Sequence, residues 1–440
     1  MSAYQLTALD YVINLQEFYQ KLGALPGFVL LESTHRSRGR YDILSACPYE
    51  QIRIPETCTT LEDELKKCAK MLPVEQSELD LPFQGGAIGY IAYDLGARLL
   101  GLKSPSQPGL EGMPLLDLGL YDWAIIADHH LKKVTLFSAN RHASTKDITQ
   151  KALQLWHSSS VSSNGFKVTS DFNPLTSKAS YQEAFYAIQD ALKSGRSYQV
   201  NLTQPFHAAY EGDAWQIYRT VSMKNPVPFS AFLRTADAAL LSFSPERFLL
   251  YDNGRLLTSP IKGTSPRSIN PLEDERLKKH LAACPKNRAE NVMIVDLLRN
   301  DFGKIAKAGT VQVANLFGIQ SYNSVHHLVS DICAICLDDI SPFVAFMSCF
   351  PGGSITGAPK LESMRIIHEQ ESYARGVYCG SIGYLSHHGR FDANIAIRTV
   401  TAKNNTLHLA AGGGIVFDSN CEDEYQECYT KIAAVVNALR

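Results

Sequence analysis

Residues 406–440, TLHLAAGGGIVFDSNCEDEYQECYTKIAAVVNALR, contain a predicted strand followed by a predicted helix. The first half is rich in apolar residues, and in the second half Ile432, Val435 and Leu439 share one helix face. The preceding segment ANIAIRTVTA, residues 393–402, reads as another strand. A doubly wound parallel fold would alternate strand and helix more regularly, so this order favours a mainly antiparallel sheet.

The rest of the sequence mixes strands and helices without regular alternation. Apolar residues at helical spacing predict helices over 61–72, 180–195, 286–301, 358–371 and 422–440. Short apolar runs bounded by turn residues predict strands over 27–33, 41–46, 85–95, 122–128, 132–139, 197–206, 238–244, 247–252, 254–261 and 380–386. We therefore predict an α+β protein with a large, mainly antiparallel sheet system, arranged as a two-lobed sandwich-like core and flanked by helices.

One stretch divides the sequence into two segments. Residues 157–177, HSSSVSSNGFKVTSDFNPLTS, are rich in Ser and Asn and lack periodic apolar positions, which is typical of a linker. We predict an N-terminal domain over residues 1–156 and a C-terminal domain over residues 178–440. The total of 440 residues fits two or three domains of ordinary size.

The composition is that of a globular protein and excludes several classes. Lys and Arg number 42 against 44 Asp and Glu, so the formal net charge is −2, and this balance argues against a nucleic-acid partner. A hydrophobic fraction of 45% against 20% charged residues argues against disorder. No apolar run reaches the roughly 18–20 residues of a membrane helix, the N-terminus lacks a signal-peptide pattern, and ten scattered cysteines form no disulfide framework. We expect a cytoplasmic protein without a membrane partner.

Acidic residues on two predicted helices are candidate metal ligands. Glu424, Glu427 and Lys431 share one helix face by their spacing, although a solvated face with an ion pair between Glu427 and Lys431 explains that spacing as well. Glu290 lies on an apolar stripe with Ile294, and carboxylates are rarely buried unless paired or bound to a metal. If Glu290 meets Glu424 and Glu427 in the fold, the three form an oxygen site suited to Mg²⁺.

Three short segments are candidates for contact with a small molecule. In SPIKGT, Lys262 follows a strand; a solvated loop lysine is the ordinary interpretation, but burial would lower its pKa and yield a nucleophilic amine. GGSITGAPK, residues 352–360, superficially resembles a P-loop, but Ala358 stands where that motif needs lysine. What remains is a glycine-rich turn before a helix, with Thr356 as a plausible cap. The glycines at 412–414 allow close approach to the backbone, and a tight turn explains them equally.

Taken together, these segments resemble a known family. The resemblance is to the chorismate-using enzymes, which include the large subunits of anthranilate synthase and aminodeoxychorismate synthase and the isochorismate and salicylate synthases. After the predicted linker, the matching blocks stand in family order: SPERF (244–248), SPIKGT (259–264), RAENVMIVDLLRND (288–301), HHLVS (326–330), GGSITGAPK (352–360), RGVYCGSIGY (375–384), IAIRT (395–399), GGGIVFDS (412–419) and EDEYQECYTKI (422–432). Before it, PGFVLLES (26–33), RYDIL (40–44) and GGAIGYIAYD (85–94) resemble the family's companion domain.

Two positions separate the branches of this family. Lys262 in PIKGT is typical of the branch that forms aminodeoxychorismate, whereas the anthranilate branch usually has alanine there. The isochorismate and salicylate synthases use water as nucleophile and carry a lysine base in the strand that here reads YQVNLT, where Gln199 stands instead. The sequence therefore most resembles the aminodeoxychorismate branch, which serves para-aminobenzoate and folate synthesis. The anthranilate branch is the alternative, and a catalytically silent tryptophan-binding module is a third.

The resemblance implies a mechanism with Lys262 and Glu246 at its centre. Lys262 would attack C2 of chorismate while the C4 hydroxyl leaves, and ammonia would then add at C4 and expel the lysine. Glu246 would be the general acid and base. The resemblance also implies that Glu290 and Glu427, with Glu424 nearby, bind a Mg²⁺ ion that holds the ring carboxylate.

The resemblance assigns the remaining candidates to binding. Arg398 and Tyr378 would hold the enolpyruvyl carboxylate, since Arg offers a bidentate fork. The other expected substrate contacts are Gly412, Gly413, Gly414, Lys431, His327, Thr356 and Thr264. By the same resemblance, the N-terminal domain would carry a tryptophan pocket built from Ser33, Arg38, Gly39, Arg40, Tyr41, Pro228, Phe229 and Ser230. Ammonia would come from a separate glutamine amidotransferase subunit.

Overall fold

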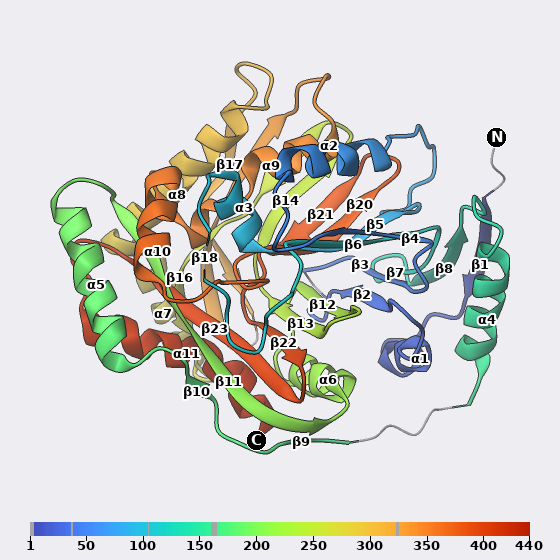
Figure 1. The fold of residues 1–440 in the computed structure, drawn as a ribbon, viewed down its shortest axis with the longest axis horizontal. Helices are drawn as coiled ribbons and strands as arrows, with labels where there is room; N and C mark the ends of the chain where they lie inside the picture. Colours follow the sequence, from blue (N-terminus) through green and yellow to red (C-terminus); the bar gives the residue numbers. More distant parts are fainter. Residues whose placement is uncertain (1–3, 37, 104, 160–164, 323–324) are drawn as a thin grey trace.

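The chain folds into two large antiparallel sheets flanked by helices (Figure 1). This is a computed structural model that describes residues 4–36, 38–103, 105–159, 165–322 and 325–440. The strands of the first sheet, in spatial order, are β1 (Gln5–Leu9), β8 (Lys133–Ser138), β7 (Trp123–Asp128), β3 (Tyr41–Ser45), β2 (Val29–Glu32), β12 (Phe229–Arg234), β13 (Ala239–Ser244), β22 (Thr399–Lys403), β23 (Thr406–Ile415), β11 (Gln199–Gly212) and β10 (Asn173–Pro174). β19 (Gly357–Ala358) and β9 (Phe166–Val168) also pair with β11.

The strands of the second sheet are also antiparallel. Its strands are β16 (Ile261–Pro266), β18 (Val325–Ile335), β15 (Arg255–Thr258), β14 (Arg247–Asp252), β21 (Phe391–Asn394), β20 (Ser381–Ser386), β5 (Gly86–Ile91), β6 (Leu116–Tyr121) and β4 (Glu50–Ile54), with β17 (Gln312–Ser321) paired to β18. The helices are α1 (Gln16–Leu22), α2 (Leu61–Met71), α3 (Tyr93–Leu99), α4 (Thr145–His157), α5 (Lys178–Lys193), α6 (Ala214–Lys224), α7 (Pro271–Ala283), α8 (Pro285–Gly303), α9 (Pro342–Cys349), α10 (Lys360–Gln370) and α11 (Cys421–Leu439), with a 3₁₀ turn η1 (Gly353–Ile355). The predicted α+β class is confirmed.

The two sheets pack face to face, and helices cover their outer faces. Side chains alternate along each strand, so Val29 of β2 joins a core between the sheets, whereas Leu30 joins a core beneath the helices. On the second sheet, Ile88 faces the inner core and Ala87 the outer one. Helices α1, α4, α5, α6 and α11 contribute to the first outer core, and α2, α3, α8 and α9 to the second (Figure 1). The architecture is a sandwich of two sheets between two layers of helices.

Both halves of the sequence contribute strands to both sheets. In the first sheet β2 pairs with β12, with Glu32 opposite Ser230. In the second sheet β5 pairs with β20, with Gly89 opposite Gly383. The predicted boundary after residue 156 therefore divides the chain but not the sheets. Of the predicted linker, residues 160–164 lie outside the described residues, and the part that follows contains β9 and β10.

The predicted helices are all present, as α2, α5, α8, α10 and α11, with ends that differ by one or two residues. Sequence periodicity did not find α7, although Asn270 caps it by accepting hydrogen bonds from the backbone N–H groups of Leu272 and Glu273. Across the described ranges, none of the helices combines the length and apolar composition that a membrane crossing needs. All ten cysteines are free thiols.

Cleaving the chain between α4 and β9 should leave its two pieces associated. Cutting one peptide bond removes neither the β2–β12 and β5–β20 ladders nor the apolar core between the sheets. We expect a protein with a protease recognition sequence inserted there to elute, after cleavage, at the same volume as the uncut protein in size-exclusion chromatography. The cleaved sample in denaturant is the control and should separate into two peaks. Separation in native buffer would show that the segments are independent domains.

Candidate active site

Lys262 lies at an irregularity of β16. The pairing of this strand with β18 shifts register between Ile261 and Thr264. Gly263 adopts a φ of +95°, a conformation that glycine reaches without steric cost. The side chain of Lys262 keeps partial exposure, but its amine is enclosed and donates a hydrogen bond of 3.4 Å to the carbonyl oxygen of Ser354. The interpretation of Lys262 as an ordinary solvated lysine does not fit this position.

Charged side chains from several elements surround this amine. Burial lowers the pKa of Lys262, while the carboxylates of Glu290, Glu246 and Glu427 oppose that shift and the ammonium of Lys431 reinforces it. The fold therefore brings α8, α11 and the turn between β13 and β14 to the same place as β16. A lysine with a lowered pKa has a larger fraction of neutral, nucleophilic amine.

Glu246 lies in the turn between β13 and β14 and is buried. Its backbone is held at both ends, because its N–H donates to the Ser244 hydroxyl and its carbonyl accepts from the N–H of Ile395. Burial raises the pKa of Glu246 to about 6, and the charge of Lys262 partly opposes the shift. Among the described residues, Oε1 of Glu246 is buried and has no hydrogen-bond partner. A carboxyl group with this pKa can exchange protons near neutral pH.

The face of α11 that was predicted from spacing points at the glycines of β23. Lys431 Nζ lies 2.7 Å from Glu427 Oε1 and donates a 2.7 Å hydrogen bond to the carbonyl oxygen of Gly412. Glu424 accepts from the Ser419 hydroxyl through Oε1, while its buried Oε2 has no hydrogen-bond partner in the described part of the chain. Burial, together with the charge of Glu427, raises the pKa of Glu424. The ion pair predicted from spacing forms, but the face is not simply solvated.

The three glycines lie within β23 rather than in a turn after it. Gly412 and Gly414 are paired with β11, opposite Thr203 and Asn201. A Cβ on Gly413 would lie 2.7 Å from Glu424 Oε2, and one on Gly414 would lie 2.6 Å from Gln199 Nε2. Glycine is needed here because side chains from α11 and β11 come close to this backbone.

The three predicted metal ligands do not form one cluster. Glu424 and Glu427 are neighbours on α11, whereas Glu290 on α8 acts mainly on Lys262. Within the residues that the structure describes, no three His, Cys, Asp or Glu side chains are gathered closely enough to hold a metal ion. The oxygen of Glu424 that lacks a partner, beside a second carboxylate, has the chemistry of a magnesium ligand.

Arg398 is a nearly enclosed guanidinium without a counterion. Burial alone lowers its pKa, and its side chain makes no ion pair or hydrogen bond with the described residues. Its backbone has a φ of +50°, which is unusual for a residue with a side chain. Nearby His327 accepts or donates a 2.8 Å hydrogen bond with Thr264, and burial together with the charge of Arg398 lowers the pKa of His327 to about 3. His327 is neutral and Arg398 makes no ion pair with a described residue, so the charge of Arg398 is available to bind a carboxylate ligand.

Thr356 and Tyr378 are buried, with different roles. The hydroxyl of Thr356 donates to the carbonyl oxygens of Gly352 and Gly353 at 3.1 and 3.2 Å and so closes the turn η1. The expectation that Thr356 caps the following helix is wrong, because α10 begins at Lys360 after Pro359 without a side-chain cap. Burial raises the pKa of Tyr378 far above its usual range, so this phenol stays neutral.

Some of the residues predicted to form a tryptophan pocket lie close together. Gly39 lies between Ser33 and Pro228, because a Cβ on Gly39 would meet the Ser33 hydroxyl at 1.8 Å and the Pro228 carbonyl at 3.4 Å. The Ser230 hydroxyl lies 3.2 Å from that of Thr34. The guanidinium of Arg40 lies over the ring of Tyr41, which is another predicted member, and pairs with Asp128; Arg38 contacts Tyr322, and Phe229 contacts Arg247.

The sequence predicted no binding role for two residues of the site, Ser354 and Gln199. Ser354 supplies the carbonyl that Lys262 contacts, and its position inside GGSITGAPK was the available signal. Gln199 is fully buried beside Gly414, and neither atom of its side-chain amide has a hydrogen-bond partner. A buried amide without a partner among the described residues is costly, and this one lies beside the glycines of β23.

Comparisons with known proteins identify the family. Residues 28–437 match the family model described as chorismate binding enzyme. The chain is 42% identical to "Aminodeoxychorismate synthase component 1" of Escherichia coli, over 96% of each chain, and 42% identical to the protein of the same name from Salmonella typhimurium, over 96% of this chain and 95% of that one. Among solved structures, anthranilate synthase component I of Streptococcus pneumoniae superposes with a TM-score of 0.78 at 29% identity, covering 90% of this chain and 92% of that one. The chain belongs to the family of chorismate binding enzymes.

Replacing Glu246 with Gln should stabilise the protein at pH 8 but not at pH 4.5. Folding raises the pKa of Glu246 from 4.5 to about 6, so below pH 4.5 both states are protonated and folding is not penalised. As the pH rises through about 6, keeping the carboxylate ionised inside the fold costs about 2 kcal/mol, which a neutral amide avoids. Differential scanning calorimetry at both pH values measures the difference. The control is Glu183→Gln on the exposed face of α5, and equal shifts at both pH values would contradict the assignment.

Proposed function

We propose that this chain is the chorismate-aminating component of an aminodeoxychorismate synthase, which converts chorismate and ammonia to 4-amino-4-deoxychorismate. The main support for this proposal is Lys262. Its amine is enclosed among carboxylates, and burial lowers the pKa of that amine. The proposal is supported by the higher identity to the two relatives named aminodeoxychorismate synthase than to the anthranilate synthase of known structure. Lys262 distinguishes these branches, because without an amine at this position ammonia would have to attack the ring directly.

In the first displacement, the neutral amine of Lys262 attacks C2 of the chorismate ring. A bond forms between Nζ and C2, the ring double bonds shift, and the bond between C4 and its hydroxyl oxygen breaks. Protonated Glu246 gives its proton to the departing hydroxyl, which leaves as water, and then takes a proton from the nitrogen of Lys262. A pKa of about 6 suits Glu246 to both transfers.

In the second displacement, ammonia forms a bond to C4 and the bond between C2 and Lys262 breaks. The double bonds return, and Glu246 gives its proton back to the amine of Lys262. The resulting carboxylate of Glu246 then takes one proton from the new nitrogen, which becomes an amine, and Glu246 returns to its protonated form. Because the two displacements move the reacting position from C4 to C2 and back, the nitrogen arrives at C4.

The substrate is a dicarboxylate, and the site offers separate groups for the two ends. Arg398, which has no carboxylate partner in the described chain, suits the enolpyruvyl carboxylate, with His327 nearby. Tyr378, which the resemblance also assigns to this carboxylate, lies near Arg375 and Cys428 instead. The backbone at 412–414 and the ammonium of Lys431 lie together and suit the ring carboxylate. Carboxylates on arginine and on backbone N–H groups make strong, charge-assisted hydrogen bonds.

Glu424 and Glu427 would hold a Mg²⁺ ion at this end of the site, whereas Glu290 lies near Lys262. When bound, the ion would neutralise their repulsion of the ring carboxylate and orient the ring. The arrangement that supports this is the oxygen of Glu424 without a hydrogen-bond partner beside Glu427.

The reaction needs a source of ammonia and a compartment. We propose a separate glutamine amidotransferase subunit as the source, which agrees with the word "component" in the names of the relatives. We place the reaction in the cytoplasm, where ten free cysteines stay reduced. The grouping of Gly39 with Ser33 and Pro228 supports a tryptophan pocket in the N-terminal half.

Replacing Lys262 with Ala should abolish formation of the 4-amino product, with a fall in rate of at least 1,000-fold, because the covalent step is lost. The purified chain would be incubated with chorismate, Mg²⁺ and an ammonium salt, and the products separated and identified by mass and ultraviolet spectrum. Lys278→Ala on exposed α7 is the control and should leave the rate unchanged. Formation of anthranilate and pyruvate by the unaltered chain, or full activity in Lys262→Ala, would overturn the proposal.

Removing Mg²⁺ with a chelator should stop turnover, and added Mg²⁺ should restore it. Glu424→Gln should raise the Mg²⁺ concentration for half-maximal activity by about tenfold to 100-fold, because one ligand charge is lost. The control is Glu422→Gln. Glu422 lies two residues before Glu424 on the same helix, so it faces the opposite way, and it pairs with Lys178 at 2.7 Å. Calorimetric titration of Mg²⁺ into the chain provides a readout without turnover, and identical Mg²⁺ affinity in both variants would exclude Glu424 as a ligand.

A further inference from the structure

Ser354, in the turn η1, lies beside both residues that carry out the proposed reaction. Its carbonyl oxygen accepts a 3.4 Å hydrogen bond from Nζ of Lys262. Its side chain is one of the groups that act on the carboxyl group of Glu246. Ser354 itself is buried, so both contacts are made away from bulk water. One residue of a short turn is therefore next to the nucleophile and to the acid and base at once.

The side chains of Ser354 and Glu246 each have a buried oxygen without a partner. Neither Oγ of Ser354 nor Oε1 of Glu246 has a hydrogen-bond partner within the described ranges. Leaving a buried polar atom without a partner costs free energy. The two oxygens are complementary, because a hydroxyl can donate and an ionised carboxylate can only accept.

The groups that face Glu246 come from three elements. Burial raises the pKa of Glu246, and four groups oppose that shift: the side chain of Ser354, the ammonium of Lys262, the backbone of Ile261 and the ammonium of Lys431. The two lysines act through charge, whereas Ser354 acts through a neutral hydroxyl. Removing that hydroxyl therefore changes the hydrogen bonding of Glu246 without changing the net charge of the site.

Close packing holds the turn η1 against its neighbours. A Cβ on Gly352 would lie 3.0 Å from Cδ1 of Ile395. A Cβ on Gly353 would lie 2.7 Å from Cδ2 of Leu297 in α8. The N–H of Ile395 also donates to the carbonyl oxygen of Glu246 at 3.1 Å. The turn and the backbone of Glu246 therefore rest on the same residue.

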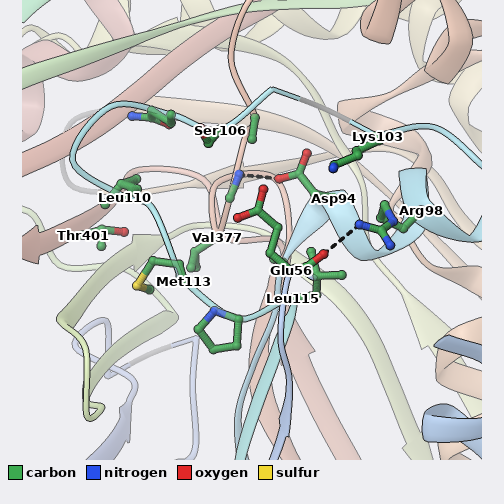
Figure 2. Close-up of a pocket in the computed structure, with 15 residues that line it drawn as sticks. Glu56, Asp94, Arg98, Lys103, Ser106, Leu110, Met113, Leu115, Val377 and Thr401 are labelled. Atoms are coloured by element: carbon green, nitrogen blue, oxygen red, sulfur yellow. Dashed lines mark hydrogen bonds between the residues drawn. The ribbon is translucent and has the colours of Figure 1, made fainter. Parts of the chain in front are cut away.

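Arg375 holds the turn from another side. Its guanidinium donates to the carbonyl oxygen of Ile355, the residue after Ser354, at 2.9 Å. The residue after Arg375 is fixed in turn, because the N–H of Gly376 donates to the carboxylate of Asp94 at 2.7 Å (Figure 2). Contacts of its neighbours therefore fix Ser354 in place, and its hydroxyl is not needed to hold the turn.

We propose that Ser354 is a positioning residue for both reacting groups: its carbonyl oxygen orients the amine of Lys262, and its hydroxyl donates a hydrogen bond to the ionised carboxylate of Glu246. A neutral amine that gives one N–H to this carbonyl has its lone pair directed away from the carbonyl. Once Glu246 has given up its proton, the hydroxyl stabilises the carboxylate that forms. The role in the reaction rests on the proposed function, whereas the hydrogen bond to Glu246 does not.

The hydrogen bond is tested without substrate by the stability of Ser354→Ala. In the fold Glu246 is ionised at pH 8 and protonated at pH 4.5, so the loss in melting temperature should be roughly twice as large at pH 8 or more. Differential scanning calorimetry measures it. In Glu246→Gln the same substitution should cost equally at both pH values, because no carboxylate is present. The control Ser348→Ala removes a hydroxyl that donates to the carbonyl of Val344 and should show no such pH dependence.

The role in the reaction is tested by the pH dependence of kcat/KM for chorismate, at a fixed concentration of free ammonia. At low pH both Lys262 and Glu246 are protonated and the pair holds one proton too many, so the rate rises as the pH passes through the pKa of Glu246, about 6. Ser354→Ala should move this midpoint upward by about one pH unit. It should also lower kcat about tenfold and leave the KM for chorismate nearly unchanged. Ser354→Thr keeps a hydroxyl and should restore the midpoint.

Each outcome decides the proposal. Equal losses of stability at pH 8 and pH 4.5 in Ser354→Ala, or an unchanged midpoint in that variant, would overturn it. A midpoint raised equally in Ser354→Ala and Ser354→Thr would assign the shift to packing rather than to the hydroxyl and would overturn it as well. If the pH-dependent loss of stability is present but the unaltered chain forms no 4-amino product, the proposed function fails and the hydrogen bond to Glu246 stands.

Discussion

The position of the active site depends on the pairing of β11 with two partners at once. On one edge, Val200 lies opposite Ile415, which sets the glycines of β23 beside Gln199 and directs the chain into α11. On the other, Gln199 and Val200 pair with Ala358 and Gly357, which carries η1 and Ser354 toward Lys262. A slip of one residue would turn every side chain of β11 to the opposite face. The site is therefore defined by strand register rather than by any single loop.

The register of β11 brings more charged side chains to the active site than the net charge of the whole sequence suggests. A net charge of −2 over 440 residues is nearly neutral, yet the enclosed amine of Lys262 lies among three carboxylates and a second ammonium. Burial shifts the pKa of Glu246 upward and that of Lys262 downward, so each moves toward its neutral form. A dicarboxylate substrate adds more negative charge. The unpaired guanidinium of Arg398 counters it at one end, and a divalent cation between the glutamates would counter it at the other.

Local patterns in the sequence predicted the elements, but not their neighbours. The spacing of Glu424, Glu427 and Lys431 placed them on one face of α11, which the structure confirms. The glycine run was compatible with a turn, and only the pairing of β11 with β23 shows why no side chain fits there. Long-range pairing also explains why the predicted division after residue 156 is invisible in the sheets, since strand partners distant in sequence leave no periodic signal. The burial of Lys262 likewise depends on α8 and α11, which approach it only in the fold.

Arg375 ties the segment that follows α10 to the sheet that carries the active site. Its guanidinium is buried and donates to the carbonyl oxygens of Ile355 and Asn201 at 2.9 and 2.8 Å and to the carboxylate of Glu371. These contacts tie β11, η1 and the end of α10 to the residue that precedes Gly376. On its other side the segment is held by α3 and the chain that follows it, because the N–H of Gly376 donates to Asp94, the carbonyl of Gly376 accepts from the N–H of Tyr93 at 2.9 Å, and the N–H of Ala374 donates to the carbonyl of Pro105 at 2.8 Å. The segment is therefore anchored on both sides, and the contact of Arg375 with Asn201 links its position to the register of β11 that defines the active site.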